Sequence, residues 1–188
     1  AERAAILSRF CDVFESHGDA IAEELAWQMG RPLRFAPSEV RGTLERARHM
    51  IAIAPAALAD IDVGPKAGFH RFLRREPLGV VFTVAAWNYP YLIAVNSVVP
   101  ALMAGNVVVL KHSAQTPLCA ERFEECLREA GLLVIPVTGR PAGWCDHIAR
   151  MWPVDAVVGE NGAFWFRHDA AAGRLVKRRL ASRTASTS

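Results

Sequence analysis

The sequence predicts an α/β fold in which several N-terminal helices precede a short parallel sheet. Residues 1–60 place apolar side chains at helical spacing, whereas residues 80–87 and 107–110 form apolar, β-branched runs of strand length. Each run is followed by a stretch with helical character. This alternation of strand and helix favours parallel pairing with right-handed crossovers.

Residues 1–60 predict three helices. The first carries an apolar stripe at i, i+3, i+4 and i+7, formed by Leu7, Phe10, Cys11 and Phe14. The second ends at Gly30 and Pro32, because glycine favours the left-handed cap and proline cannot continue a helix. A third runs from Pro37 towards Ala57.

Residues 69–81, FHRFLRREPLGVV, predict two strands joined at residues 77–79, and the charges of the first favour an exposed edge. The continuous run VVFTVAAW, residues 80–87, is typical of a strand covered on both faces. A helix is expected over 91–104, a second buried strand over 107–110, and a helix from Pro117 to Gly131. Residues 134–138, VIPVT, are a candidate third strand.

Two polar residues follow the predicted strands: Asn88 after the first and Lys111 after the second. In open parallel sheets, ligands bind at the carboxyl ends of the strands, so both residues are candidates for a ligand site. The alternative for Asn88 is a turn residue that caps the next helix.

Composition limits the possible functions. The chain has 188 residues, 52% of them hydrophobic, and a net charge of +3. Basic residues concentrate in residues 167–188, without the aromatic or glycine-rich partner segment that would favour nucleic-acid binding. The longest apolar stretch is interrupted by Pro90 and Pro100, so no membrane span is expected. The four cysteines lack metal-site spacing, which predicts no metal site and a cytoplasmic location.

Residues 76–132 contain three motifs, WNYP, PALMAGN and VVVLKHSAQTP, and closely resemble the NAD(P)-dependent aldehyde dehydrogenase superfamily. Residues 2–33 resemble its N-terminal helices, so the resemblance covers about 1–132. It implies a truncated aldehyde dehydrogenase fold with a partial Rossmann-like sheet. It also implies oxidation of a small-molecule aldehyde to a carboxylic acid with NAD or NADP, and a homo-oligomer.

The resemblance implies a role for each residue at the two strand ends. Asn88 matches the amide that donates to the oxyanion of the covalent adduct, and a neutral donor suits that task. Lys111 matches the lysine at the adenosine ribose, and Ser113 lies in the same turn. The residues that match the cofactor-lining strand end are Val84, Ala85, Ala86 and Trp87.

Some positions depart from the family pattern. Ala86 replaces a common proline, and Ala114 replaces a glutamate of many NAD-preferring members, which removes repulsion against a 2′-phosphate. The family's catalytic cysteine and general-base glutamate lie beyond the matched region, so this chain alone is expected to be inactive. Cys145 and His147 suggest a nucleophile pair, but close neighbours on a helix point in different directions.

Residues 133–169 resemble a fragment of the haloacid-dehalogenase-like phosphohydrolases, through VTGRP and GENGAFWF. In that reading Thr138 matches a phosphate-contacting hydroxyl and Asn161 lies in the matching turn, but the nucleophilic aspartate is missing. The expected organisation is therefore 1–132, 133–169 and a basic, disordered tail over 170–188. A phosphohydrolase-type activity of the tail and a non-catalytic fusion product remain alternatives.

Overall fold

The computed structural model describes residues 1–179 and separates the chain into two compact units. Unit 1 comprises residues 1–131, and unit 2 begins at Leu132. In the part of the chain that the structure describes, no helix combines the length and the apolar character that a membrane crossing needs.

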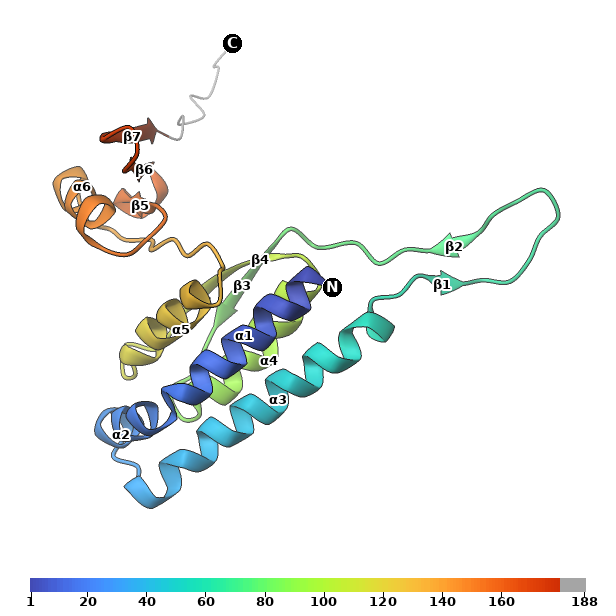
Figure 1. Ribbon diagram of the computed structural model, residues 1–188, viewed down its shortest axis with the longest axis horizontal. Helices are drawn as coiled ribbons and strands as arrows, with labels where there is room; N and C mark the ends of the chain where they lie inside the picture. The colour runs from blue at the N-terminus through green and yellow to red at the C-terminus, as the bar shows by residue number, and fades with distance from the viewer. Residues whose placement is uncertain (180–188) are drawn as a thin grey trace, which may run out of the picture. The chain divides into compact units, whose positions relative to one another are not determined.

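The N-terminal half of unit 1 is helical, as the sequence predicts (Figure 1). It contains α1 (Glu2–Ser16), α2 (Gly18–Met29), a short 3₁₀ turn η1 (Leu33–Phe35) and α3 (Ala36–Ala57). Gly30 ends α2 in the left-handed region with φ = 68°, which confirms its predicted role as a cap.

The segment between α3 and the main sheet forms a two-stranded antiparallel arm that projects beyond the helices in Figure 1. Its strands are β1 (Ile61–Asp62) and β2 (Phe72–Leu73). The predicted strand around residue 72 therefore exists, but it is much shorter than residues 69–76. It pairs with β1, which sequence analysis did not identify.

The central element of unit 1 is a parallel pair of strands joined by a helix, as predicted. The elements are β3 (Val80–Val84), α4 (Pro90–Met103), β4 (Val107–Lys111) and α5 (Leu118–Glu129), and β3 and β4 pair in register from Val80↔Val107 to Val84↔Lys111. Thr83 faces α4, where its hydroxyl lies 2.7 Å from that of Ser97.

The prediction that β3 is covered on both faces is wrong for this chain. Alternate side chains of the two strands are exposed, namely Val80, Phe82, Val84, Val107 and Val109. The apolar run reflects the composition of a strand covered on both sides, but the described residues of unit 1 cover only the side that packs on α4.

The core of unit 1 contains a cluster of aromatic rings between the helices. Phe123 of α5 lies at its centre, with ring centroids 5.5 Å from Tyr91 and 6.0 Å from Phe10. The side chains of Phe14 and His112 also contact Phe123. This cluster joins α1, α4 and α5 to the end of β4.

Unit 2 consists of α6 (Ala142–Met151), β5 (Val157–Gly159), the 3₁₀ turn η2 (Glu160–Gly162), β6 (Phe164–Asp169) and β7 (Arg174–Arg179). The three strands form an antiparallel sheet, and its core contains Cys145, Val157, Phe164 and Phe166.

Two predictions for this region are corrected. Residues 134–138 do not form a third strand of the β3–β4 sheet; they make one parallel bridge, Val137↔Val158, beside β5. Pro136 lacks an N–H group and so limits a longer ladder there. Within the expected disordered tail, residues 174–179 form β7, because its backbone pairs with β6 and Lys177 lies over the Phe166 ring. The rest of that prediction, residues 180–188, lies outside the described residues.

Candidate functional site

The carboxyl ends of β3 and β4 lie side by side. Val84 and Lys111 are the last pair in the register, and the backbone N–H of Ala85 donates to the carbonyl oxygen of Lys111 at 3.0 Å. Val84 is 61% exposed, and Lys111 is exposed beside it. The structure therefore brings two of the predicted binding positions to one open edge of the sheet.

Lys111 is the last residue of β4, and Ser113 lies in the turn that follows it. The Lys111 ammonium donates to the carbonyl oxygen of His112 at 3.2 Å, which leaves it further donor capacity. The Ser113 hydroxyl accepts the N–H of Gln115, and its carbonyl accepts the N–H of Thr116. Ser113 thus shapes the turn locally, and its hydroxyl can still donate outward.

Ala86, Trp87 and Asn88 form the exposed loop that leads from β3 to α4. The N-cap of α4 is Tyr89, and α4 has no side-chain cap hydrogen bond from that residue. The alternative that Asn88 caps the helix is therefore not realised. What is fixed at Asn88 is its backbone, because its carbonyl oxygen accepts a hydrogen bond from Arg31 at 3.0 Å.

Sequence analysis missed the two residues that hold this loop, Arg31 and Glu39. The Glu39 side chain is fully buried, forms an ion pair with Arg31, and accepts the backbone N–H groups of Tyr91 at 3.0 Å and Leu92 at 3.4 Å. One signal could have identified Glu39. Glu39 is the single carboxylate among the buried positions of α3, and it lies on the helix face that also carries Val40 and Thr43.

His112 lies buried behind Lys111. Its ring stacks on Phe123 with centroids 5.5 Å apart, and neither ring nitrogen has a hydrogen-bond partner among the described residues. Burial, with a smaller contribution from the Lys111 charge, lowers the pKa of His112 to about 4. His112 is therefore a neutral core residue near neutral pH and does not add charge to the site.

All four cysteines are buried and free of disulfide bonds. Burial raises the pKa of Cys11 and Cys119 to about 11 and that of Cys126 to about 12, and it also raises the pKa of Cys145. Since the thiolate is the nucleophile, none of these thiols is activated for attack on a carbonyl group.

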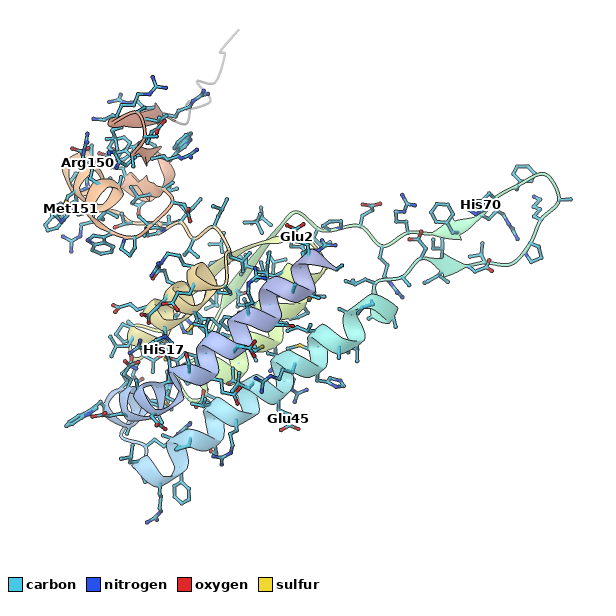
Figure 2. The ribbon with its side chains drawn as sticks, in the orientation of Figure 1. Glu2, His17, Glu45, His70, Arg150 and Met151 are labelled. Carbon is cyan, nitrogen blue, oxygen red and sulfur yellow. The ribbon has the colours of Figure 1, made fainter. Side chains whose placement is uncertain are left out.

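One cluster has the composition of a metal site. His17, at the junction of α1 and α2 (labelled in Figure 2), and the α5 residues Glu125 and Glu129 present ligand atoms within 4.8 Å of one another. However, the Glu125 carboxylate is already bound to Arg122 at 2.5 Å. The cluster is explained by that ion pairing and is not assigned as a metal site.

In unit 2, Thr138 and Asn161 lie close together, since the Asn161 N–H donates to the Thr138 carbonyl at 3.2 Å. The Thr138 hydroxyl accepts the N–H of Arg140, so it serves the local turn. A shallow hollow of about 490 Å³ lies nearby in sequence and is lined by Pro141, Gly143, Trp144 and His147. It is apolar and carries no cluster of charged groups that would hold a phosphate.

Comparison with known proteins gives a match to the family described as "Aldehyde dehydrogenase family" over residues 1–158. Among curated relatives, the succinate-semialdehyde dehydrogenase [NADP(+)] of Mycobacterium avium is 34% identical over 133 residues, or 70% of this chain. The putative enzyme of the same name from Mycolicibacterium smegmatis is 34% identical over 160 residues, or 79% of this chain.

Solved structures agree. The succinic semialdehyde dehydrogenase of Streptococcus pyogenes, in complex with NADP+, is 25% identical, with a TM-score of 0.65 over 84% of this chain. The chain spans 28% and 31% of the two curated relatives and 35% of this solved chain.

The family match continues to residue 158, past Leu132, where sequence analysis placed the end of the resemblance. Thr138 and the VTGRP segment therefore lie within the aldehyde dehydrogenase match, and these matches do not show the resemblance to phosphohydrolases. A short strand-like segment followed by Thr-Gly is not specific to one family, so the resemblance to phosphohydrolases stays a prediction.

Proposed function

The chain belongs to the aldehyde dehydrogenase family, and we propose on that basis that unit 1 carries part of the site of an NAD(P)-dependent aldehyde oxidoreductase. In this proposal the exposed edge of β3 and β4 binds the dinucleotide cofactor, and Asn88 stabilises negative charge on the aldehyde oxygen. The whole protein's reaction would be oxidation of a small-molecule aldehyde to a carboxylic acid.

The observation that carries the proposal is the pairing of Val84 with Lys111 at the carboxyl edge of a parallel sheet. A bound dinucleotide needs a flat surface for close approach and a cation for its ribose and phosphate oxygens. The exposed Val84 and the small Ala86 supply the surface, and the Lys111 ammonium supplies the charge. Val84, Ala86 and Lys111 therefore fit a bound dinucleotide.

A bound nicotinamide ring would supply the hydride acceptor for the oxidation. The chain's own contribution is made by Lys111, which holds the cofactor, and by the Asn88 amide, which donates to the aldehyde oxygen as charge develops there. Because an amide does not titrate, its donor strength does not change with pH, and a preorganised donor costs no reorganisation during reaction.

We further propose that this chain by itself does not turn over aldehydes. The chemistry of the family requires a thiolate nucleophile, and the four thiols of this chain are buried with raised pKa values. The chain would act as a cofactor-binding part.

NADP should be accepted as well as NAD. Ala114 offers no carboxylate to repel a 2′-phosphate, and the mycobacterial relatives carry NADP(+) in their names. From the names of those relatives we take only the class of the substrate, which is an aldehyde.

The test is a fluorescence titration of the full chain with NADP and with NAD. We expect weak, saturable binding that Lys111→Ala reduces by about tenfold, since one charge-assisted contact contributes about 1.5 kcal/mol or more. Lys66→Ala, which removes an exposed lysine on the arm, is the matched control and should bind like wild type. Equal binding by all three chains, or none by wild type, would refute the cofactor site. Aldehyde-dependent cofactor reduction by wild type would refute the proposed inactivity.

A further inference from the structure

We propose that Arg31 and Glu39 are positioning residues that hold the loop of Asn88 in a preorganised conformation. The inference deepens the proposed function and rests on it, because it gives a physical origin for the orientation of the oxyanion donor. Neither residue touches the proposed cofactor edge; both act through the backbone of residues 88–92.

The first step is the contact between Arg31 and the loop. One guanidinium nitrogen of Arg31 donates to the carbonyl oxygen of Asn88 at 3.0 Å, and the guanidinium plane lies over the Tyr89 ring, 4.6 Å from its centroid. These two contacts are made to consecutive residues. They fix both the peptide plane after Asn88 and the direction in which the chain enters α4.

The second step is the buried carboxylate of Glu39. Because α4 has no capping side chain of its own, its N–H groups at Tyr91 and Leu92 need an acceptor from elsewhere. Glu39 supplies it from α3, 52 residues earlier than Tyr91. A carboxylate at this position also interacts favourably with the positive end of the helix dipole.

The third step is the ion pair that joins the two contacts. The Glu39 carboxylate pairs with Arg31, so the charge of each residue is compensated, and the guanidinium is fixed for its bond to Asn88. Ala85 at the other end of the loop is tied to β4 through the Lys111 carbonyl. The loop is therefore held at three points, while the Asn88 side chain itself is exposed and free to donate.

If the contacts of Arg31 and Glu39 served only the stability of unit 1, their loss would lower the free energy of unfolding without a selective loss of order at Asn88. The experiment must therefore observe Asn88 directly. Nuclear magnetic resonance on the full, isotope-labelled chain without cofactor gives the backbone order of Asn88 and Tyr89 and the exchange rates of the Tyr91 and Leu92 amides. No step of the measurement depends on cofactor binding or turnover.

Three substitutions and one control make the test. In Arg31→Ala we expect the backbone order parameters of Asn88 and Tyr89 to fall below about 0.6, the range of flexible chain, with α1 unchanged. In Glu39→Gln, which keeps an acceptor but loses the charge, the amides of Tyr91 and Leu92 should exchange about tenfold to a hundredfold faster. Arg31→Lys should restore the charge of the pair but only part of the order at Asn88.

The control is Arg48→Ala. Arg48 lies on α3, as Glu39 does, and it pairs with the acidic residue Glu15 on the exposed side of the helix. It should leave the loop resonances unchanged. The proposal is overturned if Asn88 stays as ordered in Arg31→Ala as in wild type, or if Arg48→Ala disorders the loop equally. If the loop responds as expected while wild type binds neither NAD nor NADP, the proposed function fails and the positioning of the loop stands.

Discussion

Lowering the pH from about 7 to about 4.5 should destabilise unit 1 through His112, because its folded-state pKa lies below its ordinary value. His112 is 9% exposed, and burial lowers its pKa from 6.5 to about 4. In the unfolded chain the imidazole takes up a proton as the pH falls through 6.5. In the folded chain it stays neutral until about 4.

The stabilisation by neutral His112 is fully present above pH 6.5 and is lost as the pH falls from 6.5 towards 4. One pKa unit corresponds to about 1.4 kcal/mol, so the loss at about pH 4.5 is roughly 2 to 3 kcal/mol. That loss is a large part of the free energy of unfolding of a typical folded domain, which is roughly 5–15 kcal/mol.

The assay is urea denaturation followed by far-UV circular dichroism, which reports mainly the helices of unit 1. His112→Gln cannot take up the proton, so it should lose about 2 kcal/mol less stability than wild type over the same range of pH. The control His49→Gln, an exposed histidine of α3, should behave like wild type. If wild type and His112→Gln lose equal stability between the two pH values, the reasoning on burial is wrong.

Three further predictions concern packing and thiol chemistry. Phe123→Ala removes the ring at the centre of the aromatic cluster and should lower the free energy of unfolding of unit 1 by about 3–5 kcal/mol in the same urea assay; Phe123→Leu should cost clearly less. Gly159→Ala would place a methyl group 2.6 Å from the sulfur of Cys145, so we expect the free energy of unfolding of unit 2 to fall by about 1–3 kcal/mol. Tryptophan fluorescence should then change at a lower urea concentration than in wild type. The thiols with pKa near 11 should react with a thiol reagent at neutral pH about 100-fold more slowly in the folded chain than in urea, and comparable rates would contradict their burial.

The helices and the parallel pair of unit 1 could be predicted because their signals are local. The stripe of Leu7, Phe10 and Phe14 repeats within two turns, and β3 and β4 consist mainly of apolar, β-branched residues. Glycine and proline mark where α2 ends. Each of these features depends on residues within one element, which the sequence displays directly.

The support of the Asn88 loop could not be predicted, because it joins residues far apart in the chain. Arg31 and Asn88 are 57 residues apart, and nothing in the sequence around Asn88 points to Arg31 as its partner. Sequence analysis considered only the two local possibilities for Asn88, a cap or a ligand donor. The roles of Lys111, Ser113 and Asn88 in binding stay predictions.

The third strand and the tail failed for a different reason. Strand-forming residues do not specify their partners: residues 134–138 run beside β5, and the basic run ending at Arg179 pairs with β6. In β7 the charged residues lie exposed while Leu175 packs against the small core of unit 2. Charge density alone therefore gave the wrong expectation of disorder for residues 174–179.

The cap that Glu39 supplies to α4 has a consequence for the order of folding. The first turn of α4 obtains its acceptor only after α3 has docked, so this contact has to wait for a long loop to close. We expect this contact to form after the transition state, because the loop that separates its partners has to close first. Weakening this bond should therefore speed unfolding far more than it slows refolding, and the loop would be among the first parts of unit 1 to open.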